Sequence, residues 1–224
     1  RGTGALVVNL CGAAFFAAVA WALWLWTGVF EQWLFLGVGY YAVFSWTMGL
    51  RARDLPTYRL TWGSPAFLCV ILGYGTVAFM AYAASYWGAP YAERALGADK
   101  TELGWFLGAP GAVAGFLGVI LGGRMADYLL ERRPEGRVWV ILFGLVMPLP
   151  AMWVAYTTSD VAVFYVGAFL AQLLSASALG AAAASSQALV LPRMRGLATA
   201  TFFLATTLIG LGLGPFMAGY VSAT

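Results

Sequence analysis

The chain has 224 residues, of which 62% are apolar and 9% are charged, and its net charge is +3 at neutral pH. A soluble domain is roughly half apolar and about a quarter charged, and no soluble fold of this size could bury so much apolar surface. We therefore expect an all-α, polytopic membrane helical bundle. The sequence contains no histidine, the commonest metal ligand and catalytic base, and we expect no metal site, no cofactor and no nucleic-acid partner.

Seven apolar runs predict seven membrane-spanning helices. Each run is long enough to cross about 30 Å of hydrocarbon, and a spanning segment in lipid must be helical because its backbone has no water to bond. The runs are 5–28, 32–50, 66–88, 103–123, 138–157, 161–190 and 197–221. The chain opens with Arg1 rather than Met and shows no cleavable signal, so we expect further chain before it.

The basic residues gather in alternate connections between these runs. Ten of the twelve are Arg1, Arg51, Arg53, Arg59, Arg124, Arg132, Arg133, Arg137, Arg193 and Arg195. By the positive-inside rule, these residues face the cytoplasm and the C-terminus lies on the other side. We expect an integral, multi-pass protein of the plasma membrane, of the bacterial inner-membrane type. A retinal protein also has seven spans, but its lysine lies within a span, and the one lysine here is Lys100, in a loop.

A weak internal repeat relates the first and last spans. Arg1-Gly2 opens the first and Arg195-Gly196 opens the last, and both spans are rich in Gly, Ala and Phe. Two similar six-helix halves would give this period of six helices. The first span would then be the fifth helix of twelve and the last the eleventh. We expect three parts: 1–50 as the last two helices of the N-terminal bundle, 51–65 as a cytoplasmic linker, and 66–224 as the C-terminal bundle.

The fourth connection, residues 122–133, carries a glycine, three further residues, an aspartate and then an arginine cluster. This pattern resembles the motif of the major facilitator superfamily, and its alternative reading is a charged loop that obeys the positive-inside rule. The candidate gating residues are Gly123, Asp127, Arg132, Arg133 and, at the start of the last span, Arg195. We expect Gly123 to allow close helix approach, Asp127 to end its helix near another helix's N-terminus, and the arginines to pair with it on closure.

The last span contains Gly210 and Gly214 in a small-xxx-small pattern, followed by Pro215, which predicts close helix packing and a bend. The string from Gln187 to Pro215 resembles the spinster branch of that superfamily, as does 66–222 more broadly, although a family Asn appears here as Thr207. The resemblance implies a monomeric secondary transporter that works by alternating access, with a lipid substrate such as a lysophospholipid or sphingoid phosphate and with proton coupling. A transporter of a small polar solute or drug is the alternative, and a receptor or scaffold is a further one.

Uncharged polar side chains inside the spans are the candidate substrate-binding groups. The resemblance implies that the seventh, eighth, tenth and eleventh helices line the cavity. The candidates are Tyr74, Tyr82, Gln172, Ser175, Phe203, Thr206 and Thr207. Gln172 and Tyr82 are favoured because each would bury a large polar group that requires a partner. The alternative is that these side chains only bond neighbouring helices.

No ionisable residue lies well inside a span. Such a residue is costly in lipid and is usually functional, so we expect any proton-coupling carboxylate to lie in helices before Arg1. Intramembrane catalysis needs carboxylate pairs, a Ser–His pair or a metal cluster, and the spans hold none of these, so we do not expect an enzyme. A glycine stripe, with members at 104, 108, 111, 115, 118 and 122, predicts one tightly packed helix face.

Overall fold

A computed structural model describes residues 2–223, and the predicted cytoplasmic position of Arg1 lies outside the described residues. The described residues form helices and contain no strand, and they divide into two compact units, Arg1–Leu68 and Cys69–Thr224. In this part of the chain seven helices are long and apolar enough to cross a membrane. The all-α membrane architecture and the seven spans are therefore confirmed.

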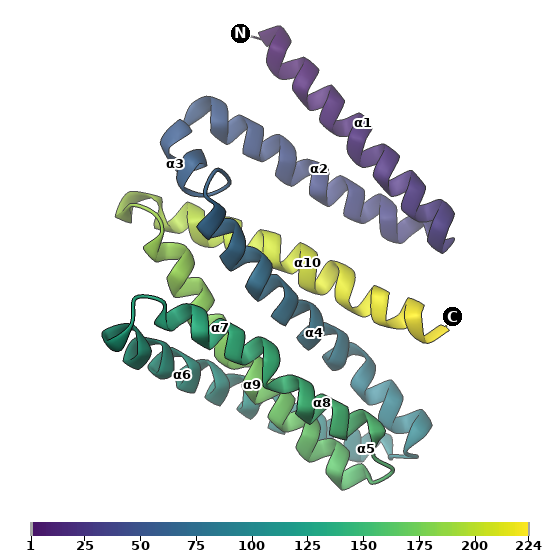
Figure 1. Ribbon diagram of the computed structural model, residues 1–224. Coiled ribbons are helices and arrows are strands. Elements are labelled where there is room, and N and C mark those ends of the chain that lie inside the picture. The colour runs from purple at the N-terminus through teal and green to yellow at the C-terminus, as the bar shows by residue number, and fades with distance from the viewer. Residues whose placement is uncertain (1, 224) are drawn as a thin grey trace. The chain divides into compact units, whose positions relative to one another are not determined.

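The first unit is a helical hairpin with a short third helix (Figure 1). Helix α1 (Gly2–Thr27) turns through Gly28, whose φ of +77° favours glycine, into α2 (Phe30–Arg53). The indole Nε1 of Trp33 donates a hydrogen bond to Thr27 Oγ1 over 2.6 Å across this turn. Helix α3 (Leu55–Leu60) follows, and the Asp54 carboxylate caps it. The predicted linker, 51–65, thus contains a helix.

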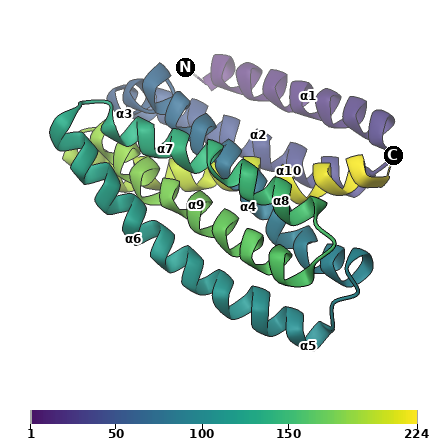
Figure 2. The same ribbon diagram turned by 60° about the horizontal axis from the view of Figure 1, so that its bottom comes forward.

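The second unit holds the remaining spans. They are α4 (Pro65–Ala95), α5 (Lys100–Leu103), the π-helix η1 (Gly104–Gly108), α6 (Ala109–Arg132), α7 (Gly136–Val146), α8 (Pro148–Thr157), α9 (Val161–Ala188), the short 3₁₀ turn η2 (Pro192–Met194) and α10 (Arg195–Ala223). Helix α9 packs against α6, α7 and α8, and α6 and α9 lie side by side in both views (Figures 1 and 2).

The contact between α6 and α9 depends on small residues. A Cβ atom added at Gly122 would overlap the carbonyl oxygen of Ser177, and one added at Gly118 would overlap that of Leu173. In lipid, van der Waals packing drives helix association, and glycine lets two backbones approach closely. The two helices therefore touch backbone to backbone over this stretch.

Glycines also bring α4 and α10 together. A Cβ at Gly214 would lie 2.5 Å from the Phe79 carbonyl oxygen, and one at Gly210 would lie 2.7 Å from the Ala78 Cβ. The Trp87 indole Nε1 donates to the Pro215 carbonyl oxygen over 2.7 Å. Helix α10 runs on through Pro215 to Ala223.

Several predicted boundaries were wrong. The helix predicted to end at 123 continues to Arg132, and the one predicted to end at 88 continues to Ala95. Hydropathy detects only the apolar part of a helix, whereas a charged final turn beyond the hydrocarbon can stay helical. The run 138–157 is divided into α7 and α8 at Pro148, which has no backbone N–H to continue the helix.

Candidate functional site

A cavity of about 410 Å³ lies inside the second unit. Its walls come from α4, from η1 and the start of α6, from α8 and from α9. Most lining side chains are small or aromatic, and the polar ones belong to Ser85, Tyr156, Gln172 and Ser175. No Asp, Glu, Lys or Arg is among the lining residues. A mostly apolar pocket with a few converging polar groups is typical of a small-molecule site.

Gln172 is the largest amide in this cavity. It lies on α9 and its side chain lies beside α6, where a Cβ at Gly115 would be 3.8 Å from the Gln172 Nε2. Within the described residues its amide makes no hydrogen bond. A primary amide offers two donors and one acceptor oxygen, and leaving them unmet in an apolar setting is unfavourable. Gln172 is thus free to bond a ligand that enters the cavity.

Two tyrosines join α8 to α4 at the cavity wall. The Tyr91 hydroxyl donates to the Tyr156 carbonyl oxygen over 2.9 Å, and the Tyr156 hydroxyl donates to the Ala84 carbonyl oxygen over 3.4 Å. Sequence reasoning missed Tyr156, because the resemblance assigned the lining to the seventh, eighth, tenth and eleventh helices. The structure gives a wall to the ninth helix, as α8, and none to the eleventh, α10. The prolines that interrupt 138–157 were the available signal.

Of the seven predicted substrate residues, Gln172 and Ser175 line the cavity, and Ser175 is buried. The other five lie on α4 and α10, outside its lining. The Tyr74 ring is 5.3 Å from that of Phe202, between centroids, and Tyr82 lies against Gly210.

The three predicted residues of α10 differ in exposure. Thr206 is buried, and its hydroxyl donates to the Phe202 carbonyl oxygen over 2.8 Å within the same helix. Phe203 and Thr207 are exposed. A contact between these residues, Tyr74 or Tyr82 and a substrate stays a prediction.

The candidate gating motif lies on a helix rather than in a connection. Asp127 is inside α6 and exposed, so the prediction that it ends a helix was wrong. The Arg132 guanidinium carbon lies 4.2 Å from the centroid of the Tyr128 ring, a cation–π contact. Arg133 follows the last turn of α6, and Arg195 begins α10. In the described part of the chain no ion pair joins Asp127 to an arginine.

Gly123 lies in the contact between α6 and α9. A Cβ added at Gly180 of α9 would lie 3.7 Å from the Gly123 Cα and 3.8 Å from its backbone N. The approach is closer at the preceding residue, because a Cβ at Gly122 would overlap the backbone of α9, whereas no atom lies within 4 Å of the place for a Cβ at Gly123. The motif thus places two neighbouring glycines at this contact.

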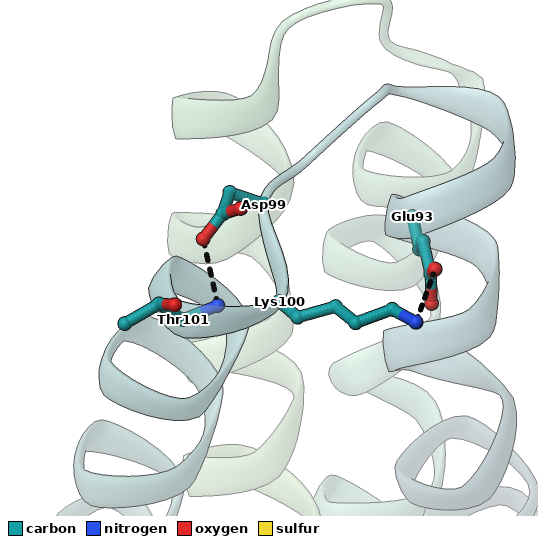
Figure 3. Close-up of polar contacts among 4 residues, drawn as sticks. All are labelled: Glu93, Asp99, Lys100 and Thr101. Atoms are coloured by element: carbon teal, nitrogen blue, oxygen red, sulfur yellow. Dashed lines mark hydrogen bonds and ion pairs between the residues drawn. The ribbon is translucent and has the colours of Figure 1, made fainter.

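At the other end of the unit, α4 and α5 are joined by an ion pair. The Lys100 Nζ lies 3.2 Å from the Glu93 Oε1, and Figure 3 shows the lysine reaching across to the neighbouring helix. Beside it, Asp99 accepts a hydrogen bond from the backbone N–H of Thr101 over 2.8 Å. This bond holds the pKa of Asp99 below its ordinary value. Among the described residues, no three His, Cys, Asp or Glu side chains gather to form a metal site.

Comparisons with known proteins agree on one family. No protein-family model matches the chain. An MFS-type efflux pump of Mycolicibacterium smegmatis is 30% identical over 158 residues, which are 70% of this chain and 37% of that protein. Protein spinster homolog 1 of Xenopus laevis is 23% identical over 193 residues, again 37% of the relative. The chain thus spans little more than a third of these relatives.

Solved structures give the same result. The chain matches crystal structures of a bacterial homolog to the human lysosomal transporter Spinster, both inward-facing. For the unoccupied form the TM-score is 0.69 at 25% identity, covering 96% of this chain and 50% of that one. For the occupied form the TM-score is 0.67 at 27% identity, covering 98% and 50%.

The helices, the interhelical glycines and these matches define the chain as part of a polytopic protein of the major facilitator superfamily. Within that superfamily it belongs to the spinster-like branch. It is accordingly an integral, multi-pass membrane protein.

Proposed function

We propose that this chain is the central and C-terminal part of a secondary active transporter that works by alternating access. The cavity of the second unit supplies its half of the substrate site. The observation that carries this proposal is a cavity of about 410 Å³ with an apolar lining, in which the amide of Gln172 has no partner within the described chain.

The lining favours a single-chain amphiphilic lipid, of the lysophospholipid or sphingoid phosphate type. Burying a bare charge in an apolar cavity is unfavourable without a partner, and no charged side chain lines this one. The cavity therefore suits the alkyl chain and the neutral linkage next to it, where an ester, amide or hydroxyl group meets Gln172. The charged headgroup would lie outside it. Apolar burial contributes about 0.8 kcal/mol per CH₂ group, so the alkyl chain supplies most of the affinity.

Proton coupling is part of the proposal, with its carboxylate outside this stretch. The nine acidic residues lie in connections or near helix ends. They are Glu31, Asp54, Glu93, Asp99, Glu102, Asp127, Glu131, Glu135 and Asp160. None of them lines the cavity. A complete protein that moves protons with no acidic residue in the helices before this stretch would contradict this part.

A second candidate is the export of a drug-like solute, which the name of the mycobacterial relative favours. A thermal-shift measurement on the complete protein separates the two. Lysophospholipids should raise the melting temperature, while sugars and cationic drugs should not. Stabilisation by drugs alone would favour the second candidate, and no response to any lipid would overturn the first.

A further inference from the structure

The segment formed by α5 and η1 covers one side of the cavity. Phe106, Leu107 and Gly108 of η1 line it. Leu103, the last residue of α5, is buried in a cluster that also contains Ala92 and Phe164. The segment lies at the end of α6 opposite Arg132, because α6 continues from η1 to that residue.

The backbone of this segment departs from the α-helix at one place. Gly104–Gly108 forms a π-helix between the α-helical stretches α5 and α6. Pro110 is the second residue of α6, and since it has no N–H, the carbonyl one turn before it loses its α-helical partner. Kinks in long helices occur at prolines and π-bulges, and π-bulges are frequent at functional sites.

Glycines on the two sides of this break have different surroundings. Gly118 and Gly122, deeper in α6, meet the backbone of α9. At Gly104, Gly108 and Gly111, no described atom lies within 4 Å of the place for a Cβ. Close packing within the described chain thus explains the first pair and leaves the other three unexplained. Glycine without a packing role adds conformational freedom to a helix.

Side-chain contacts hold the segment against its neighbours, and the buried one is that of Leu103. The Lys100–Glu93 pair is solvent-exposed, with 80% and 45% of the two side chains accessible, and such a pair contributes little. The Phe106 ring stacks on that of Tyr165 on α9, with centroids 5.1 Å apart and planes 14° apart. Figure 3 shows that the lysine crosses to α4 while the segment's own cap, Asp99, bonds only locally. The segment is therefore attached by its side chains rather than by backbone contact.

We propose that η1 is a hinge and that α5 with η1 is a lid, which swings about 104–111 to open and close the cavity at the end of α6 opposite Arg132. This proposal rests on the proposed function, because it assigns a moving part to the same cavity. The lid carries Phe106 in and out of the cavity wall and breaks the Lys100–Glu93 pair as it opens. The rest of α6 stays fixed to α9 through Gly118 and Gly122.

The test measures the bend directly in the complete protein, reconstituted in lipid. Spin labels are placed at Glu102→Cys and Leu130→Cys, in a background without other reactive cysteines. The 28 residues between them span about 42 Å of helix. A matched control pair, Ala162→Cys and Ala188→Cys, spans the unbroken helix α9. We expect two distances, or one broad distribution, for the first pair and one narrow distribution for the control.

The double substitution Gly108→Ala and Gly111→Ala then reduces the backbone flexibility of the hinge. It creates no steric clash, since both sites have room for a methyl group. The distribution of the first pair should narrow to the width of the control, and transport of a lysophospholipid should fall several-fold. A narrow distribution in the unmodified protein, or no change in the double variant, would overturn the hinge. Loss of folded, monodisperse protein would also overturn it, because the glycines would then serve packing. A protein that moves no amphiphile contradicts the proposed function, while the distance result still decides the hinge.

Discussion

Two halves of one spanning helix use glycine differently. In the half near the arginines, Gly118 and Gly122 bring α6 into backbone contact with α9. In the half that begins with η1, Gly104, Gly108 and Gly111 meet no described atom at the position of a Cβ. Glycine at the same helical spacing thus forms a close contact between α6 and α9 in one half. In the other half it lies beside a cavity and a π-helix. Spacing alone does not separate packing from mobility.

The largest loss of stability is expected at the close contact between α6 and α9. Gly122→Ala places a methyl group on the carbonyl oxygen of Ser177, so α6 and α9 must move apart. Overpacking of this kind costs about 1–3 kcal/mol or more, and we expect a large fall in melting temperature and in the yield of folded protein. Gly115→Ala is the matched control, because its Cβ would lie 3.8 Å from Gln172 Nε2, an ordinary contact. Equal stability of the two variants would contradict the idea that Gly122 has a packing role that Gly115 lacks.

A smaller effect is expected at the cavity. Gln172→Ala should reduce transport while expression stays near normal, because it removes the free amide. One lost hydrogen bond is worth about 0.5–1.5 kcal/mol, which corresponds to roughly 2- to 13-fold in affinity. Ser185→Ala is the control, since that hydroxyl is bonded to the Ala181 carbonyl on the same helix and lies outside the cavity. If Gln172→Ala unfolds the protein instead, the residue serves packing.

The sequence predicts the architecture better than the site. Seven apolar runs suffice for seven helices, because lipid leaves the backbone no alternative to a helix. Helix ends are predicted less well, since the final turns of α6 around Asp127 carry charged side chains and hydropathy gives no helical signal for them. The predicted tight packing along the glycine stripe holds at Gly118 and Gly122 but is wrong at Gly104, Gly108 and Gly111. Which glycines touch a neighbour depends on where α6 crosses α9, and no local pattern encodes that crossing point.

The residues that line the cavity are also only partly predictable from the sequence. Gln172 is predictable because a large amide in an apolar run requires a partner. Tyr156 is not, because it lies on α8, which follows the break at Pro148, packs against α9 and is hydrogen-bonded to α4. Candidates on α10 depend on resemblance alone, and the lining of this cavity does not include them.

A third prediction concerns the contact between α4 and α10. Trp87→Phe keeps the ring and removes the donor to the Pro215 carbonyl oxygen. Hydrogen bonds between membrane helices average about 0.6 kcal/mol, so the melting temperature should fall by only a few degrees. Trp153→Phe, at a side chain that is 74% exposed, should leave it unchanged. A fall in melting temperature as large as that of Gly122→Ala would mean that the α4–α10 contact matters as much for stability as the α6–α9 contact.

The smallest effect is expected at Asp99, at the start of the lid. The Thr101 backbone N–H lowers the pKa of Asp99, so its contribution is present above the unfolded pKa, about 3.9. It is lost as the pH falls through the lower folded value. The protection of the Thr101 amide, measured as its exchange rate relative to an unstructured peptide at the same pH, should therefore fall only below about pH 4. In Asp99→Ala this protection should be absent at every pH, and a wild-type amide that is already unprotected at pH 6 would contradict the cap.

Photoaffinity labelling can show whether a lysophospholipid occupies the cavity of the second unit. A lysophospholipid with a diazirine in its alkyl chain is bound to the complete protein, and the labelled residues are identified by mass spectrometry with and without unlabelled competitor. Met152 lines the cavity, whereas the next residue, Trp153, faces outward and is 74% exposed. We expect competed labelling at Met152 and around Gln172, and uncompeted labelling at Trp153. Labelling confined to Trp153 and other outward residues, unaffected by competitor, would contradict it.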